Sequence, residues 1–204
     1  MSTARILVLA DEVNPALYDY FEPERLKGID LIISCGDLPA DYLSFLVTVS
    51  DADLLYVPGN HDDSYEYKPP EGCICIDSDV YTWRGLTILG LGGSMRYKPG
   101  PCQYTQKEMG RRAASMWFKL LKAGKLDILV THAPAQGIND GPDLAHSGFK
   151  AFMDILSRYH PACFIHGHVH MNYGNYPRIS NYQDTTVVNA FGSYVLEVEL
   201  PETD

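Results

Sequence analysis

Five short apolar runs, each too short for a stable helix, are followed directly by side chains that carry a carboxylate, an amide or an imidazole. The runs are Ile6–Leu9, Leu31–Ile33, Leu54–Val57, Ile128–Val130 and Phe164–Ile165. Runs of this length and composition are typical of strands buried on both faces of a parallel sheet. Segments with helical periodicity separate several of them, which predicts an α/β fold with parallel strand pairing.

The remaining segments complete this pattern of strands and helices. Helices are predicted from Pro15 to about Phe21, over Pro39–Val49, over about Thr105–Lys122 and over Ser147–Tyr159. Short β-like runs joined by turns are predicted at Ile74–Ile76, Val80–Trp83 and Leu86–Leu91. Thr185–Asn189 and Ser193–Leu200 are predicted to close the chain as a β pair. No repeat or linker divides the chain, so residues 1–204 are expected to form one domain.

The composition limits the classes of function that the chain can have. It has 204 residues, of which 46% are hydrophobic, and a net charge of −10. A chain of this length buries roughly 70% of its unfolded surface in one core, which excludes a disordered chain. The negative charge repels polyanions, so we expect neither extended nucleic acid nor an anionic membrane as a partner. No apolar run reaches the roughly 18 residues of a membrane span.

The first residues and the cysteines indicate a compartment. The chain enters its first apolar run without a charged leader or a cleavage site, so no signal peptide is expected. The five cysteines are an odd number. Reduced thiols therefore fit better than a disulfide framework, and a cytoplasmic location is predicted.

The polar residues behind the apolar runs share one chemical character. They are Asp11, Gly36-Asp37, Gly59-Asn60-His61-Asp62, His132 and Gly167-His168-Val169-His170. Ligands bind at the carboxyl ends of the strands in open α/β sheets, so residues far apart in sequence meet there. Asp, Asn and His together suit a divalent transition metal. A lone Asp is usually a cap and a lone His is usually structural, but the ordered set indicates a metal site.

Four of these motifs resemble, in the same order, those of the calcineurin-like metallophosphoesterases. They are Gly36-Asp37, Gly59-Asn60-His61-Asp62, Thr131-His132-Ala133-Pro134 and Gly167-His168-Val169-His170. The resemblance implies an α/β (α+β) fold: a four-layer αββα sandwich with two mixed β-sheets inside and helices outside. It also implies two divalent metal ions, with Mn, Fe and Zn all admissible, and the hydrolysis of phosphoesters.

The resemblance assigns ligands to each of the two implied metal ions. Asp37 would bridge the ions. The His132 site would consist of Asp37, Asn60, His132 and His168, and the Asp11 site of Asp11, Asp37 and His170. Two cations about 3.5–4 Å apart hold a hydroxide and clamp the phosphate oxygens, so the implied mechanism is attack by metal-bound hydroxide.

His61 would face the scissile phosphate instead of binding metal. An imidazole at this position is suited to protonate the leaving oxygen, and the adjacent Asp62 is the residue expected to orient it. His61 and Asp62 are therefore the predicted catalytic pair.

The first motif departs from the family pattern. Where the family has Asp-x-His, this chain has Asp11-Glu12-Val13, and a valine cannot bind metal. Position 13 is predicted to lie on the same side of an extended chain as Asp11, whereas Glu12 points the other way. Asn14 or a water is the remaining candidate to fill the gap. The Asp11 site is therefore expected to bind metal more weakly than the His132 site.

Two further residues are predicted to contact the substrate. Arg96 leaves a glycine-rich loop and is placed to hold a phosphate bidentately, with a solvated arginine as the alternative. His146 precedes a predicted helix, and its alternative role is a hydrogen bond at the helix start. Tyr97 lies in the same loop as Arg96, where either stacking on a nucleobase or a protein interface would use an aromatic ring.

The sequence thus favours a metal-dependent phosphoesterase for a small phosphodiester or nucleotide over one for a phosphoprotein. A catalytically weak or inactive scaffold on the same fold is the alternative that Val13 supports, and a metal-binding regulatory protein is a further one. The retained histidines at positions 61, 132, 168 and 170 count against a scaffold, which has no physical need for a cluster of ligands.

Overall fold

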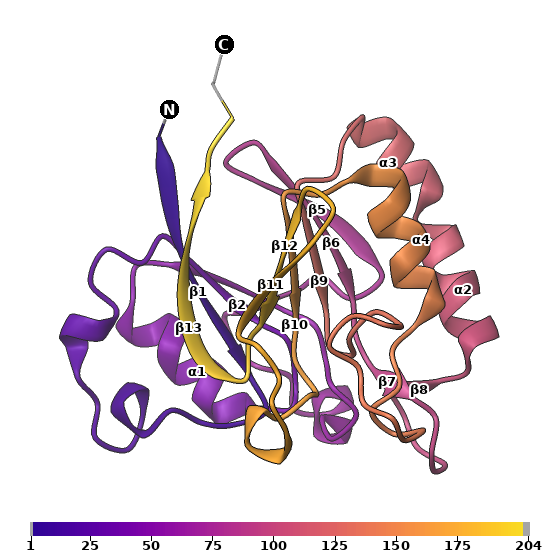
Figure 1. Cartoon of the computed structure of the whole chain (residues 1–204). Helices are drawn as coiled ribbons and strands as arrows, with labels where there is room; N and C mark the ends of the chain where they lie inside the picture. Colours follow the sequence, from indigo (N-terminus) through magenta and orange to yellow (C-terminus); the bar gives the residue numbers. More distant parts are fainter. Residues whose placement is uncertain (1, 202–204) are drawn as a thin grey trace.

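The first three apolar runs form parallel strands of one β-sheet. A computed structural model describes residues 2–201, with β1 (Thr3–Ala10), β2 (Leu31–Ser34) and β3 (Asp53–Tyr56) as parallel neighbours. The short β4 (Ile74–Cys75) extends the sheet at one edge. At the other edge β13 (Gly192–Glu199) pairs antiparallel with β1 (Figure 1).

The other two apolar runs form the centre of a second, mixed sheet of order β11-β12-β10-β9-β6-β5. Its two central strands are β9 (Ile128–Thr131) and β10 (Cys163–His166), which are parallel. They are flanked in parallel by β6 (Leu86–Leu91) and β12 (Thr185–Asn189). The antiparallel edges are β5 (Asp79–Trp83) and β11 (Ile179–Tyr182). A separate parallel pair consists of β7 (Ser94–Met95) and β8 (Gln103–Tyr104).

Both faces of the two sheets are covered, which is why their central strands are apolar without alternation. Along β1, Ile6 and Val8 pack between the sheets, whereas Leu7 and Leu9 pack in the layer that contains α1 (Ala40–Val49). The outer face of the second sheet is covered by α2 (Gln106–Ser115), α3 (Trp117–Ala123) and α4 (Lys150–Tyr159) (Figure 1). The predicted four-layer αββα sandwich with two mixed sheets is confirmed.

The predicted pairing of the last two strands is wrong. β12 pairs with β10 and β11, whereas β13 crosses to the first sheet and pairs with β1 along its whole length. The chain changes sheets just before Gly192, whose φ of +68° is easily adopted by glycine. β11 was not predicted, because its sequence Ile-Ser-Asn-Tyr has almost no apolar pattern. Both differences arise because strand pairing is decided by contacts remote in sequence.

Three predicted helices differ from those observed. The segment after Pro15 forms only a 3-10 turn over Pro15–Leu17, since a stretch bounded by Pro15 and Pro23 is too short for a stable helix. The predicted helix over Thr105–Lys122 is divided at Met116 into α2 and α3. Ser147 does not cap α4, which begins at Lys150; the Ser147 hydroxyl donates to the Asp143 carbonyl instead.

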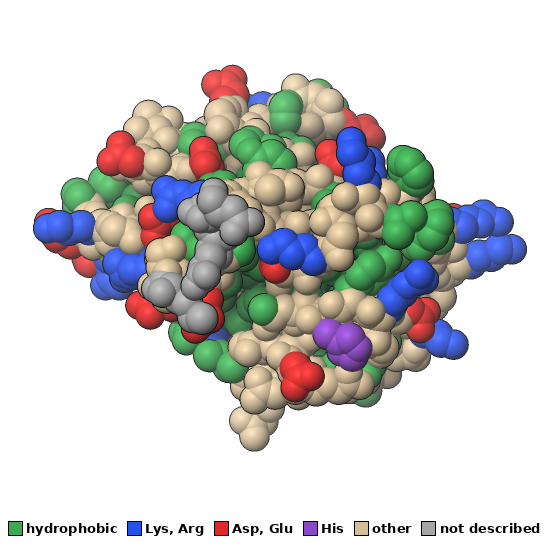
Figure 2. Space-filling model, turned by 90° about the horizontal axis from the view of Figure 1, so that it is seen from above, with side chains coloured by type: hydrophobic (Ala, Val, Ile, Leu, Met, Phe, Trp, Pro, Cys, Tyr) green, Lys and Arg blue, Asp and Glu red, His purple; other side chains and the backbone are tan. Residues whose placement is uncertain are grey.

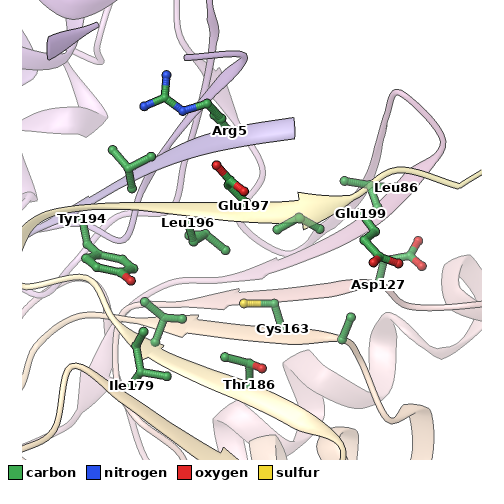
Figure 3. A pocket seen from close by; sticks show the side chains of 14 residues that line it. Arg5, Leu86, Asp127, Cys163, Ile179, Thr186, Tyr194, Leu196, Glu197 and Glu199 are labelled. Carbon is green, nitrogen blue, oxygen red and sulfur yellow. The ribbon is translucent and has the colours of Figure 1, made fainter. Parts of the chain in front are cut away.

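The sheets separate at the edge formed by β13, where a cavity of about 760 Å³ lies between them. Tyr194 and Leu196 of β13 face Cys163 and Thr186 of the second sheet across it (Figure 3). Cys163 is the first residue of β10, so this cavity lies at the opposite end of the sheet from the predicted ligands. Within residues 2–201, no helix has the length and apolar character needed to cross a bilayer.

Candidate metal centre

The strand ends meet at a cavity of about 520 Å³. Seven of the ten residues predicted for the site line it: Asp11, Asp37, Asn60, His61, His146, His168 and His170. They follow β1, β2, β3, β9 and β10, as the sequence predicts for the carboxyl edge of parallel strands. His132 and Asp62 are buried beside these residues, and Arg96 is turned away.

Asp37, His132 and His168 form the densest group of possible metal ligands. One ligand atom from each lies within 4.8 Å of the others. His132 is fully buried, and its Nε2 lies 3.1 Å from Asn60 Oδ1 and 3.4 Å from Asp37 Oδ2. Its Nδ1 is 2.7 Å from the Cys35 carbonyl oxygen, which can only accept a hydrogen bond, so Nδ1 carries the proton. The carbonyl therefore fixes the tautomer that leaves Nε2 facing the other ligands.

His168 is held in the same manner. Its Nε2 is 2.7 Å from the carbonyl oxygen of Ala145, so the proton resides there and Nδ1 keeps its lone pair. Its ring centroid is 4.8 Å from that of His132. Its backbone amide donates to Asp11 Oδ2 at 2.9 Å, which connects the loop after β10 to the end of β1. Backbone contacts thus orient both imidazoles without using the atoms that would bind a cation.

Asp11 provides an independent test of whether a cation fits here. Its Oδ1 is buried and accepts no hydrogen bond from the residues that the structure describes, and His170 Nε2 lies 3.7 Å away. A buried carboxylate oxygen that accepts no hydrogen bond and has only an imidazole at 3.7 Å is weakly compensated, and a cation would satisfy it. The donor set of carboxylate, amide and imidazole is also the set that divalent transition metals accept. The residues present therefore fit the metal that the motifs imply.

Three of the possible ligands have unusual backbone conformations. Asp11, Asp37 and His168 have φ of 64°, 56° and 67°. The left-handed region costs non-glycine residues of order 1–3 kcal/mol and is concentrated at functional sites. The surrounding loops must therefore hold these three backbone conformations in place.

Asp62 holds two of these loops together. Its Oδ2 accepts from the amides of Asp37 and Gly59, both at 2.7 Å. The approach is so close that a Cβ on Gly59 would lie 2.1 Å from Asp37 Oδ1, and one on Gly36 2.2 Å from the Gly59 nitrogen. Only glycine fits at both positions, which explains the glycines in these two motifs.

The position of Asp62 differs from the predicted one. We expected it to orient His61, but both of its side-chain hydrogen bonds go to backbone amides across the loop. His61 is exposed at the cavity, and its own amide donates to Asp37 Oδ1 at 2.7 Å. Burial raises the pKa of Asp62 to about 6 against the effect of the two amides. Asp62 is thus a buried connection between loops, and His61 stands beside it.

The electrostatics of the His132 site show what a cation would replace. Burial opposes charge on both Asp37 and His132, yet their mutual attraction prevails. It holds the pKa of Asp37 well below its usual range and raises the pKa of His132 to about 9. Burial, with the charge of His132, lowers the pKa of His168 to about 4. A proton on His132 therefore occupies the position of positive charge that a metal ion would take.

The region around Val13 is arranged differently from the prediction. β1 ends at Ala10, and the positive φ of Asp11 breaks the extended chain on which the predicted alternation rested. Val13 packs in the layer that contains α1 and does not line the cavity. The Asn14 side chain already has hydrogen-bond partners away from the site, since it accepts from the Ala16 amide and donates to the Ser193 hydroxyl. Neither residue replaces the missing imidazole.

The two residues predicted to bind substrate have different surroundings. His146 lines the cavity, pairs with Asp143 at 2.8 Å and has its ring centroid 5.3 Å from that of His168. Arg96 points away, donating to the Gln103 carbonyl and pairing with Glu108 at 2.9 Å. Its neighbour Tyr97 lines the cavity instead, with its hydroxyl 3.5 Å from Asn60 Nδ2. The sequence identified Tyr97 only as an aromatic residue of this loop. No spacing pattern shows which of the neighbours Arg96 and Tyr97 points into the cavity.

Comparison with known proteins decides the family. The family model for calcineurin-like phosphoesterases matches residues 5–172. The chain belongs to the calcineurin-like phosphoesterase family. No curated protein matches it in sequence. Membership in this family supports metal-dependent phosphoester hydrolysis in general.

Solved structures resemble the chain at low sequence identity. TT1561 of Thermus thermophilus is 17% identical with a TM-score of 0.65, over 94% of this chain and 90% of that one. Sulfate thiohydrolase SoxB, also of Thermus thermophilus, is 11% identical with a TM-score of 0.49, over 93% of this chain and 52% of that one. Vps29 of Chaetomium thermophilum is 16% identical with a TM-score of 0.42, over 93% and 71%. The similarity to TT1561 supports the fold assignment.

Proposed function

We propose that this protein is a divalent-metal-dependent phosphoesterase that hydrolyses a phosphodiester or a small nucleotide. The observation that carries the proposal is the group of Asp37, His132 and His168 within 4.8 Å, in which backbone carbonyls bind the outward nitrogen of each imidazole. A merely structural cluster has no need for two imidazole nitrogens and a carboxylate oxygen within 4.8 Å of one another.

The residues that would hold two cations are those of the His132 site and the Asp11 site, with Asp37 shared. Bound cations would supply positive charge to the phosphate oxygens and lower the pKa of water. The chain contributes the geometry, because the buried carboxylates and imidazoles are fixed before any ligand arrives. Mn, Fe and Zn remain the proposed metals, with the His132 site as the tighter one.

His61 is the proposed proton donor. Its side chain is exposed on the cavity wall, and its backbone amide is anchored to Asp37 Oδ1 at 2.7 Å. An imidazole in this position can transfer a proton from a ring nitrogen to the leaving oxygen of the ester. Asp62 supports this role indirectly, since it holds the loop from which His61 projects.

The cavity supports a small substrate. Its volume of about 520 Å³ suits a nucleotide-sized molecule, whereas a folded phosphoprotein would need a more open surface. Tyr97 on the rim offers a ring on which a base can stack. The net charge of −10 disfavours long nucleic acid. We further propose a reducing, cytoplasmic location, because all five cysteines are free thiols.

An inactive metal-binding scaffold is the second candidate, and Val13 favours it. Chelator-treated protein titrated with Mn²⁺ separates the two, with bis(4-nitrophenyl) phosphate and 4-nitrophenyl phosphate as substrates. We expect hydrolysis that is faster for the diester and that rises in two stages, as first the His132 site and then the Asp11 site fills. Binding of Mn²⁺ without hydrolysis of either compound would establish the scaffold.

A further inference from the structure

The helical layer over the second sheet carries a concentrated apolar patch. Trp117, Phe118 and Leu121 of α3 are 46%, 69% and 59% exposed. They are three of the nine large hydrophobic side chains that are exposed in the described part of the chain, and they lie within one helix of seven residues. Single exposed apolar residues are ordinary, but a contiguous group marks an interaction surface.

A groove between α2 and α4 continues this patch. Two adjoining cavities of about 190 and 340 Å³ share Gly110, Ala151 and Asp154. Trp117 and Tyr159 line the end nearest the patch, and Lys107 and Lys150 line the other. The surface is therefore concave, mostly apolar with Arg158 at one end and bearing two lysines at the other, with the single carboxylate of Asp154 between them.

The charge of this face is opposite to that of the whole protein. Residues 105–125 hold six of the sixteen Lys and Arg residues but only one acidic residue, in a chain of net charge −10. Within residues 2–201, Lys107, Arg111, Lys122 and Lys150 form no ion pair. Figure 2 shows Lys and Arg side chains around exposed hydrophobic ones on its right side, where α3 and α4 lie.

We propose that the face formed by α2, α3 and α4 binds an acidic amphipathic helix of a partner protein. The apolar side of such a helix would cover Phe118 and Leu121 and enter the groove, and its acidic side would meet the unpaired cations. Charge complementarity selects this occupant. None of the α-helices described for this chain has an acidic polar face, so a second copy does not offer the required segment.

A lipid bilayer is the less suitable occupant of this face. A flat membrane surface cannot fill a groove between two helices, and the strongly negative remainder of the protein would be repelled by anionic lipid. The groove and the net charge together therefore favour a folded protein segment.

The two tryptophans allow a direct test. Trp83 is only 4% exposed, so a change in tryptophan emission on binding reports Trp117. The probe is a peptide helix of about 16 residues, roughly 24 Å long, with Leu along one face and Glu on the others and with no aromatic residue. Its matched control has the same composition in an order that scatters the leucines. We expect a blue shift and saturable binding with the first peptide only.

Substitutions then locate the binding face. F118S with L121S, and separately K107E with R111E, should each weaken peptide binding at least about tenfold, as is typical for central contacts. The matched controls are Y20S and K27E, which change equally exposed residues elsewhere. All four proteins should hydrolyse the chromogenic diester like the unmodified protein, since none of these residues lines the metal cavity.

Several outcomes would overturn the proposal. They are equal binding of both peptides, unchanged binding by both surface variants, and tighter binding to phosphatidylserine vesicles than to the acidic helix. Concentration-dependent dimerisation that F118S with L121S abolishes would assign the face to a second copy instead. Circular dichroism confirms that each variant is folded, so a loss of binding is attributable to the surface.

Discussion

The two halves of the proposed metal centre differ in how their candidate ligands are held. In the His132 site, the imidazoles of His132 and His168 are buried, and each has its outward nitrogen 2.7 Å from a backbone carbonyl oxygen. In the Asp11 site, His170 is a third exposed, and Asp11 Oδ1 accepts no hydrogen bond from the described residues. The residue that would complete this half in the family pattern is Val13, which packs in the α1 layer.

The difference indicates that metal affinity depends on the hydrogen bonds that orient each ligand as well as on the ligand residue itself. A carbonyl that binds one imidazole nitrogen fixes the other for a cation, and such partners are worth about 10–100-fold in metal affinity. The His132 site has two such carbonyls on buried imidazoles, whereas the Asp11 site has a histidine that is a third exposed and a valine where the family pattern has a second histidine. We therefore expect the halves to fill in sequence, which gives the predictions below.

The largest effect should come from removing one histidine of each half in turn. H132A should lose both metals after desalting and reduce hydrolysis to background, because it also deprives Asp37 of its buried partner. H170A should keep one metal and part of the activity. Elemental analysis of each desalted protein, with a thermal melt as a control for folding, checks this. Equal metal loss in the two variants would contradict the unequal halves.

H61A should lower the rate of hydrolysis roughly 10²–10⁴-fold, the range that general acid catalysis contributes, and should leave the metal content unchanged. The hydrogen bond that joins His61 to Asp37 is made by the His61 amide, which alanine keeps. The loss should be smaller for a nitrophenolate leaving group, which needs no proton, than for an alkoxide. Steady-state rates on one diester of each kind measure this ratio. Identical losses would exclude proton donation by His61.

D62A should lower metal affinity about 10–100-fold, as expected for a residue that orients a ligand without touching the metal. It leaves the buried amides of Asp37 and Gly59 without an acceptor. D62N should recover most of the affinity, since both amides bind one oxygen, Oδ2, which an amide oxygen can replace. Metal titrations of both variants, with the exposed D63A as a control, decide between positioning and charge. Failure of D62N to recover affinity would show that the charge itself is required.

The smallest effect is expected for V13H. Because position 13 packs in the α1 layer, the new imidazole should not reach the Asp11 site. The second stage of metal activation should therefore occur at the same metal concentration as in the unmodified protein. Introducing a polar ring there should lower the free energy of unfolding by about 1–2 kcal/mol. V13L, similar in polarity to valine, is the matched control for packing. A shift of the second stage to lower metal concentration would mean that the loop can turn position 13 toward the cavity.

Much of the centre was predictable because its residues stand where strands end. Asp11, Asp37, Asn60, His61, His132, His168 and His170 all follow buried apolar runs, and parallel pairing brings such ends to one edge. The same runs predicted the layers of the fold, since strands covered on both faces are apolar throughout. These inferences need only local patterns and a general rule of sheet topology.

The roles of three other residues depended on contacts remote in sequence. Asp62 was expected beside His61 but bridges two loops, and Arg96 was expected at a phosphate but pairs with Glu108. Val13 was expected beside Asp11 but packs under α1, because the left-handed turn at Asp11 ends the alternation of an extended strand. Side-chain direction in a loop follows from such turns and from neighbouring elements, which spacing does not encode.

The sequence by itself determined most of the strands, the order of the candidate ligands along the chain and the resemblance to the family. Only the tertiary structure decided that β12 and β13 belong to different sheets, that carbonyls of Cys35 and Ala145 fix the imidazoles, and that neither Val13 nor Asn14 fills the gap in the Asp11 site. The physical reason is the range of the interactions. Apolar runs and turn residues act within a few positions, whereas strand partners and hydrogen-bond acceptors are chosen when distant segments pack together.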